Sequence, residues 1–140
     1  MLDIFNKSKD IQGLEDEKDL TKIAALLIHA AKIDDNYSDK EKLIIVSFLK
    51  SIGVKKNIEE IIKKAEIEET QSNQILRYTQ EIKKNSLEFK KEIVKILWKI
   101  ILSDGKSDMY ENTLMRRIAG LLYIPDKLIG EIKTEVLNKK

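Results

Sequence analysis

Two short acidic segments carry the residues whose types and spacing could do chemistry. Asp34 and Glu41 lie in the first segment, and Asp104 and Glu111 take the same spacing in the second. Carboxylate oxygens are the ligands that hard divalent cations such as Ca²⁺, Mg²⁺ and Mn²⁺ prefer. Four carboxylates in one place repel each other unless a cation or bound water screens them. If the two segments meet, the sequence predicts an acidic divalent-cation site, whose further candidate ligands are Asp35, Ser38 and Asp108.

The same residues also have a purely structural interpretation. Ser38 with Glu41, and Asp108 with Glu111, have the spacing of a capping box, in which the first side chain and the later glutamate satisfy backbone amides at a helix start. Such a cap stabilises a helix by about 0.5–2 kcal/mol without any ligand. An EF-hand does not fit, because the span from aspartate to glutamate is too short for that loop. The capping and cation-binding interpretations both stay open.

Composition excludes most other chemistry. The 140 residues contain no Cys and one His, which removes disulfides, iron–sulfur clusters, zinc fingers and His-rich metal sites. A net charge of +2 argues against a dedicated nucleic-acid binder. The N-terminus lacks the apolar core of a signal peptide, and the longest apolar stretch, Ile23 to Ala31, is too short to span a bilayer. We therefore expect a cytoplasmic protein with no transmembrane segment.

Helical spacing of apolar residues predicts an all-α fold of about seven helices. Two of these helices are apolar on nearly all sides and should be central. Gly53 should end a helix, Asn57 and Asn85 should cap helix starts, Pro125 should occupy a first helical position, and residues 66–70 should fray or turn. The expected helices span residues 16–32, 38–51, 57–65, 70–84, 85–101, 108–122 and 125–138.

A shift of 70 residues aligns the two halves of the chain without gaps. Leu27 then falls on Leu97, and Phe48 falls on Ile118, while the acidic segments coincide. We expect a lead-in over residues 1–15 and one domain over 16–140, with internal repeats at about 20–65 and 90–136 that are related by a pseudo-two-fold axis. The halves differ in charge, since residues 1–70 carry a net −3 and residues 71–140 a net +5.

The motif in its context resembles the TerB-like (tellurite-resistance protein B) family. The clearest part runs from Ile101 to Glu111, and it is followed by Arg116, Arg117, Ile118 and Ala119. The usual pattern is Ala-Asp-Gly, one residue, an apolar residue, Ser or Thr, two residues, then Glu. Both copies here keep the Asp and the Glu. The departures are Ile33 and Ser103 for the Ala, Asp35 for the first Gly, and Ser107 for the apolar residue that Tyr37 supplies in the first copy.

The resemblance implies a compact helical bundle of two halves with an acidic metal-binding site. It also implies a non-catalytic accessory role linked to tellurite and other chemical stress, together with protein partners, including membrane-associated assemblies. Two alternatives remain from the residues themselves. One is a protein-interaction module in which the motifs only cap helices, and the other is a hydrolase that uses paired carboxylates.

The remaining polar and aromatic residues are expected to be structural or solvent-facing. His29 and Trp98 should belong to the packing of the two central helices. Surface positions are expected for Tyr110, Tyr123, Arg116 and Arg117.

Overall fold

The computed structural model describes residues 17–33, 37–72, 74–104 and 109–138, and all regular structure within these ranges is helical. The lead-in over residues 1–15 lies outside them. None of the described helices combines the length and apolarity that crossing a membrane requires. The helices are α2 (Glu17–Lys32), α3 (Asp39–Ser51), α4 (Ile58–Gln71), α5 (Ile75–Ile82), α6 (Leu87–Ile101), the 3₁₀ turn η2 (Leu102–Asp104), α7 (Met109–Leu122) and α8 (Asp126–Asn138).

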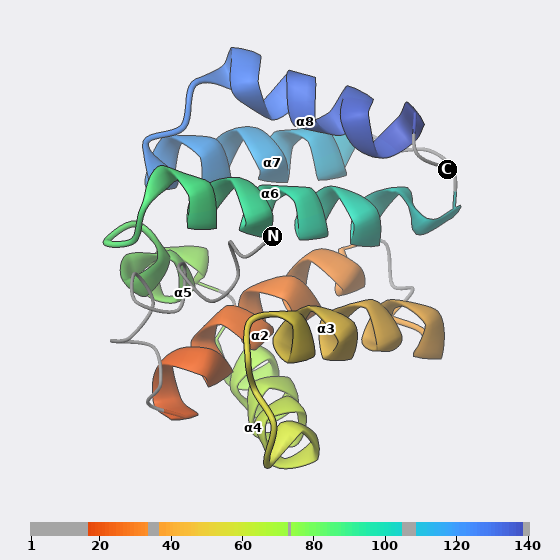
Figure 1. Ribbon diagram of the computed structural model, residues 1–140, viewed down its shortest axis with the longest axis vertical. Coiled ribbons are helices and arrows are strands. Elements are labelled where there is room, and N and C mark those ends of the chain that lie inside the picture. Colours follow the sequence, from red (N-terminus) through yellow and green to blue (C-terminus); the bar gives the residue numbers. More distant parts are fainter. Residues whose placement is uncertain (1–16, 34–36, 73, 105–108, 139–140) are drawn as a thin grey trace.

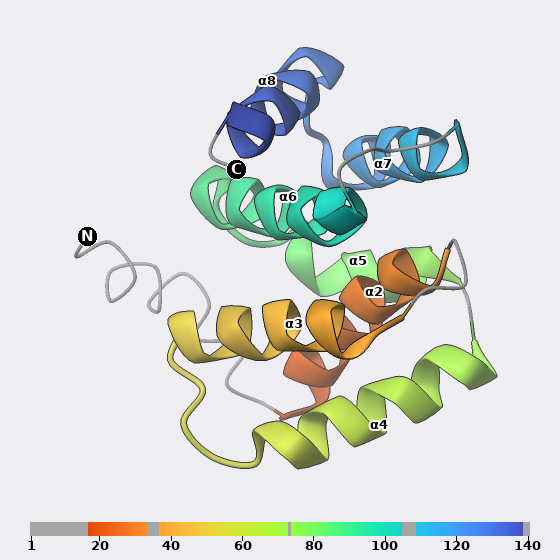
Figure 2. The ribbon, with the colours of Figure 1, turned by 90° about the vertical axis from the view of Figure 1, so that its right-hand side faces the viewer.

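The helices form two groups with α5 between them (Figures 1 and 2). One group holds α2, α3 and α4, and the other holds α6, α7 and α8. Contacts between α2 and α6 join the groups, and α5 packs on both α2 and α7. With the 70-residue shift, the start of α2 coincides with the start of α6, and the start of α3 with that of α7. The all-α architecture that the spacing predicts is confirmed.

The two helices expected at the centre are the most deeply buried. Ten of the 16 residues of α2 are buried, including Leu26 and Ile28 on opposite sides of its main apolar face. In α6, eight of 15 residues are buried. A helix with apolar residues all round is stable only when other elements cover every side. In this fold α2 is covered by α3, α4, α5 and α6.

Two helices end in the same hydrogen-bonded motif. After α3, the amides of Gly53 and Val54 donate to the carbonyl oxygens of Lys50 and Leu49, at 3.1 and 3.0 Å. This is the Schellman pattern, and Gly53 takes the left-handed conformation that it requires, with φ of 101°. The end of α7 repeats both bonds 70 residues later, with Tyr123 at φ of 59° in place of glycine. The predicted role of Gly53 is confirmed.

Five expectations about helix boundaries are wrong. The helix expected over 70–84 is α5, which covers only Ile75–Ile82. Residues 66–70 continue α4 to Gln71 instead of fraying. Asn57 precedes α4 in a left-handed conformation, and its side chain makes no cap. The cap of α6 is Ser86 rather than Asn85, since Ser86 Oγ accepts from the amide of Phe89 at 3.2 Å. Pro125 lies just before α8, and its carbonyl accepts from the amide of Ile129 at 3.2 Å.

We expect Gly53→Ala to lower the free energy of unfolding by about 1–2 kcal/mol, because a Cβ is strained in the left-handed conformation. Urea unfolding followed by Trp98 fluorescence would measure the change. The control is Gly130→Ala in the exposed middle of α8, where a Cβ meets nothing within 4 Å. This control should gain about 0.5–1 kcal/mol. An unchanged Gly53→Ala variant would contradict the conformational argument.

Candidate functional site

The first acidic segment is built around the buried carboxylate of Glu41, which is 4% exposed. Glu41 lies in the first turn of α3, and its Oε1 accepts hydrogen bonds from the backbone amide and from the hydroxyl of Ser38, both at 2.6 Å. The bond from the amide belongs to a capping box at the start of α3, in which the Ser38 side chain also accepts from the backbone amide of Glu41. The capping box that the spacing of Ser38 and Glu41 predicts is therefore present in the structure.

The same carboxylate also joins the two acidic segments. The hydroxyl of Ser103 donates to Glu41 Oε2 at 3.0 Å, and Lys40 Nζ donates to the carbonyl oxygen of Ser103 at 2.8 Å. Ser103 lies in η2, directly before Asp104. The start of α3 in the first acidic segment is thus hydrogen-bonded to η2, which follows α6 and contains Asp104 of the second segment.

Tyr37 fixes the first segment from the other side. Its hydroxyl donates to Glu66 Oε2 of α4 at 2.8 Å, and Lys42 Nζ lies 3.5 Å from the same oxygen. Burial raises the pKa of Tyr37 above the ordinary tyrosine value, and the hydrogen bond and negative charge of Glu66 raise it further. The phenol therefore stays protonated and remains a hydrogen-bond donor near neutral pH.

The structure brings together only some of the predicted ligands. Glu111 lies in the first turn of α7 and is 3% exposed, so each segment contributes one buried glutamate. Asp104 closes η2, but its side chain is among those not described. Asp34, Asp35 and Asp108 lie outside the described residues. Within the described part of the chain, no three His, Cys, Asp or Glu side chains gather as a metal cluster would require.

Comparison with known families decides the relationship. The family model described as tellurite resistance protein TerB matches residues 20–134. The chain belongs to the TerB family. Neither the curated proteins nor the solved structures give a match to it. The match runs from α2 through most of α8, and it includes both acidic segments.

The TerB domain also holds a group of charged residues around the buried Glu69 that its sequence pattern did not reveal. Glu69 of α4 accepts from Lys32 Nζ at 2.8 Å, and its other oxygen lies 3.2 Å from His29 Nδ1. Both partners are in the last two turns of α2. Burial alone would raise the pKa of Glu69, but the hydrogen bonds and charges of Lys32 and His29 outweigh it, so the pKa lies below the usual value. The cluster joins α2 to α4.

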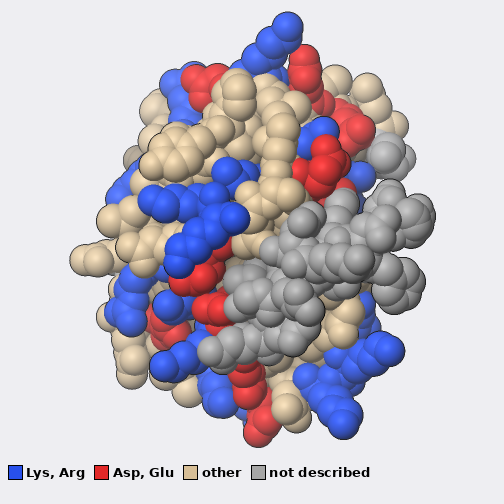
Figure 3. Space-filling view, turned by 60° about the vertical axis from the view of Figure 1, so that its left-hand side comes forward, with Lys and Arg blue, Asp and Glu red and all other residues tan. Residues whose placement is uncertain are grey.

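The other expectations for single residues are confirmed. Trp98 is buried, and its indole N–H donates to the carbonyl oxygen of Ile129 at 3.1 Å, which joins α6 to α8. Tyr110 and Tyr123 are each 74% exposed. The side chains of Arg116 and Arg117 are exposed as well. Figure 3 shows that basic and acidic side chains are interspersed over the described part of one face of the TerB domain.

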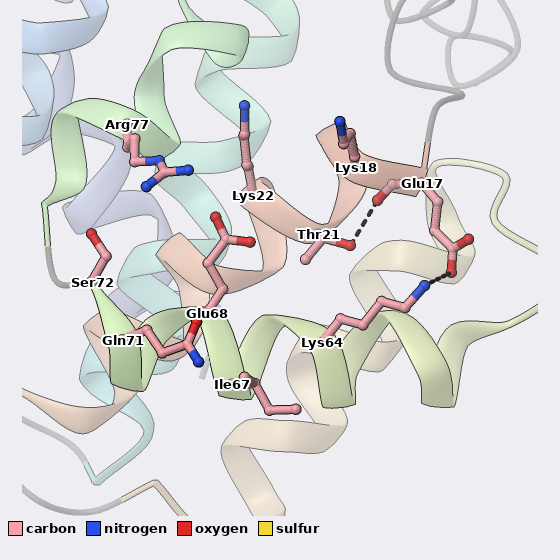
Figure 4. Close-up of a pocket in the computed structure, with 10 residues that line it drawn as sticks. All are labelled: Glu17, Lys18, Thr21, Lys22, Lys64, Ile67, Glu68, Gln71, Ser72 and Arg77. Carbon is pink, nitrogen blue, oxygen red and sulfur yellow. Dashed lines mark hydrogen bonds and ion pairs between the residues drawn. The ribbon is translucent and has the colours of Figure 1, made fainter.

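A pocket of about 830 Å³ lies away from the acidic segments, between the start of α2, the end of α4 and the start of α5 (Figure 4). Its lining mixes cations such as Lys22 and Arg77 with Glu17 and Glu68, and Ile67 is the one apolar residue among its lining residues. An ion pair between Lys64 and Glu17, at 3.4 Å, lies within it. The pocket therefore presents charges of both signs to a ligand.

We expect Glu41 and Ser103 to be energetically coupled across the two segments. A double-mutant cycle of Glu41→Gln and Ser103→Ala, measured by urea unfolding, should give a coupling energy of about 1 kcal/mol. The pair Ser47 and Glu41 supplies the control, because Ser47 is exposed and lies on the same helix. Strict additivity for the Glu41 and Ser103 pair would contradict the contact.

We expect the contribution of Glu69 to depend on pH. Because its pKa is lowered in the folded state, the stabilisation is complete above the pKa of the unfolded state and is lost as the pH falls through the folded value. Glu69→Gln should therefore cost about 1–3 kcal/mol at pH 7, and the difference from wild type should shrink towards pH 3. Urea unfolding of both proteins over this range would measure it. A difference that is constant with pH would refute the ion pairing.

Proposed function

We propose that this TerB domain is a non-catalytic accessory protein that binds a divalent cation between its two acidic segments. The observation that carries the proposal is the hydrogen bond from Ser103 to Glu41, which anchors one segment against the other. Glu41 and Glu111 supply a buried carboxylate from each segment. Asp34 and Asp104 are the further ligands that we propose, with Asp35, Ser38 and Asp108 near them in sequence.

The chemistry of this donor set selects the cation. Ligands that consist only of oxygen suit Ca²⁺, Mg²⁺ or Mn²⁺, whereas the absence of Cys and the single His give no soft ligand set for other metals. A bound cation would neutralise carboxylates that otherwise repel each other. It would also stabilise the contact between the two groups of helices, because the ligands come from both.

The cellular role that we propose follows from the family. The family model is described as a tellurite resistance protein. We propose that the chain acts in the cytoplasm, in the response to tellurite and other chemical stress, through contacts with other proteins, including membrane-associated assemblies. The matching helix starts at a 70-residue shift support two halves that are related as internal repeats.

One observation favours a second candidate function, a protein-interaction module in which the acidic segments only cap helices. Both oxygens of Glu41 already accept hydrogen bonds, from Ser38 and from Ser103. A carboxylate satisfied in this way needs no metal to remain buried. The two functions make different predictions, because only the first expects a cation to stabilise the protein by binding the aspartates.

A thermal-shift assay with Ca²⁺, Mg²⁺, Mn²⁺ and Zn²⁺ tests the proposal. One of the first three should raise the Tm of the wild type, by an amount equivalent to about 2–3 kcal/mol at a hundredfold excess over Kd. The rise should vanish in Asp34→Asn/Asp104→Asn. The control Glu59→Gln/Asp126→Asn changes two exposed first-turn acids outside the acidic segments and should keep the rise. If the two Asp34 and Asp104 substitutions destabilise the protein equally with and without cation, the capping function is correct.

A further inference from the structure

A shallow groove follows α3 where it faces α6 and ends beside α8. Two adjoining hollows of about 460 and 390 Å³ form it, and they share Ile44, Lys95 and Lys99. The sides of the groove come from α3 and α6, and Val136 of α8 lies at one end. These hollows belong neither to the buried core nor to the mixed-charge pocket of Figure 4.

The surface of the groove is apolar. Four of its apolar residues are almost fully covered, Ile44 is half-buried, and Leu43 is 65% exposed. Single exposed apolar side chains are normal on a protein surface. Leu43 differs because it lines the same hollow as Ile44, Phe48 and Ile96 and so extends their apolar surface. The apolar residues of the groove are Leu43, Ile44, Phe48, Ile96, Leu102 and Val136.

The edge of the groove is positively charged. Lys95 and Lys99 lie one helical turn apart on α6, and Lys40 lies at the start of α3. Lys40 donates to the carbonyl oxygen of Ser103. Lys95 and Lys99 make no ion pair or hydrogen bond with their side chains within the described residues. Glu92 is the one acidic residue that lines the groove, so the groove has an excess of positive charge.

We propose that this groove docks an acidic amphipathic helix of a partner protein. An open groove between two helices accepts the apolar face of a third helix, whose side chains fit between those of the other two. Acidic residues spaced four apart on that helix would face Lys95 and Lys99, since both pairs repeat once per turn. An amphiphile of low molecular weight would need a site that encloses most of its surface, whereas the groove is open along its length. The proposal does not depend on the cation site.

Fluorescence anisotropy with the full chain tests the proposal. The probe is a fluorescein-labelled synthetic peptide of about four helical turns, with leucines at i, i+4 and i+7 spacing on one face and glutamates on both flanks. The comparison peptide carries lysine in place of every glutamate. Measurements in EDTA keep the result independent of any cation. The acidic peptide should bind, its affinity should fall as salt rises from about 50 to about 500 mM, and the lysine peptide should not bind.

Variants of the chain locate the binding. Leu43→Asp, and separately Lys95→Glu/Lys99→Glu, should each weaken binding of the acidic peptide by about tenfold or more. Two matched controls should bind as the wild type does. Ile67→Asp changes an apolar residue of α4 that is 57% exposed, and Lys55→Glu/Lys63→Glu reverses two exposed lysines outside the groove. All of these positions have exposed or half-buried side chains, and circular dichroism would check that each variant is folded.

Three results would overturn the proposal. The first is binding that lacks the expected selectivity. The acidic and lysine peptides would then bind equally, or the groove variants would bind the acidic peptide as the wild type does. The second is retention of the chain on vesicles of phosphatidylglycerol and phosphatidylcholine with no binding of the acidic peptide, which would make the groove a lipid surface. The third is binding of a synthetic peptide of residues 1–16 without binding of the acidic probe, which would make the occupant a segment of this chain.

Discussion

The rest of the structure depends on the burial of α2. Ten of the 16 residues of α2 are buried, and four other helices pack against it to cover them. Ser38 and Glu41 follow α2 closely in the sequence, and Ser103 lies in η2 directly after α6. The packing of these two central helices therefore sets where the described residues of both acidic segments lie.

Glu41 links the two groups of helices through its hydrogen bonds. A buried carboxylate is costly unless donors satisfy its oxygens, and three donors do so here. Two come from Ser38 within the same segment, and one comes from Ser103 of the other segment. The bonds from Ser38 are local to the start of α3, whereas the Ser103 bond requires α6 to end where it does. The side chain of Glu41 therefore takes part both in capping α3 and in the contact between the two segments.

Local sequence predicted what local interactions determine. The central helices, the end of α3 at Gly53 and the cap at Ser38 follow from spacing and from single residue types. Capping-box spacing predicted Asn57 and Asn85 as caps. In the structure Asn57 is left-handed and makes no side-chain cap, and the neighbouring Ser86 caps α6. The stretch from Glu66 to Thr70 was expected to fray because it is acidic. It stays helical and its Glu69 contacts Lys32 and His29, which are 37 and 40 residues away, so local spacing gave no sign of this contact. Tyr123 takes the left-handed conformation that glycine favours, and its residue type does not predict this.

The candidate cation site and the groove meet at two residues, Lys40 and Ser103. Both line the groove, and both form the contact between the acidic segments. A lysine ammonium has three N–H donors, so Lys40 can keep its bond to the carbonyl oxygen of Ser103 while it pairs with a partner carboxylate. A cation beside Glu41 would add positive charge near the same lysine. Lys40 is therefore the groove lysine through which a cation and a docked helix could affect each other.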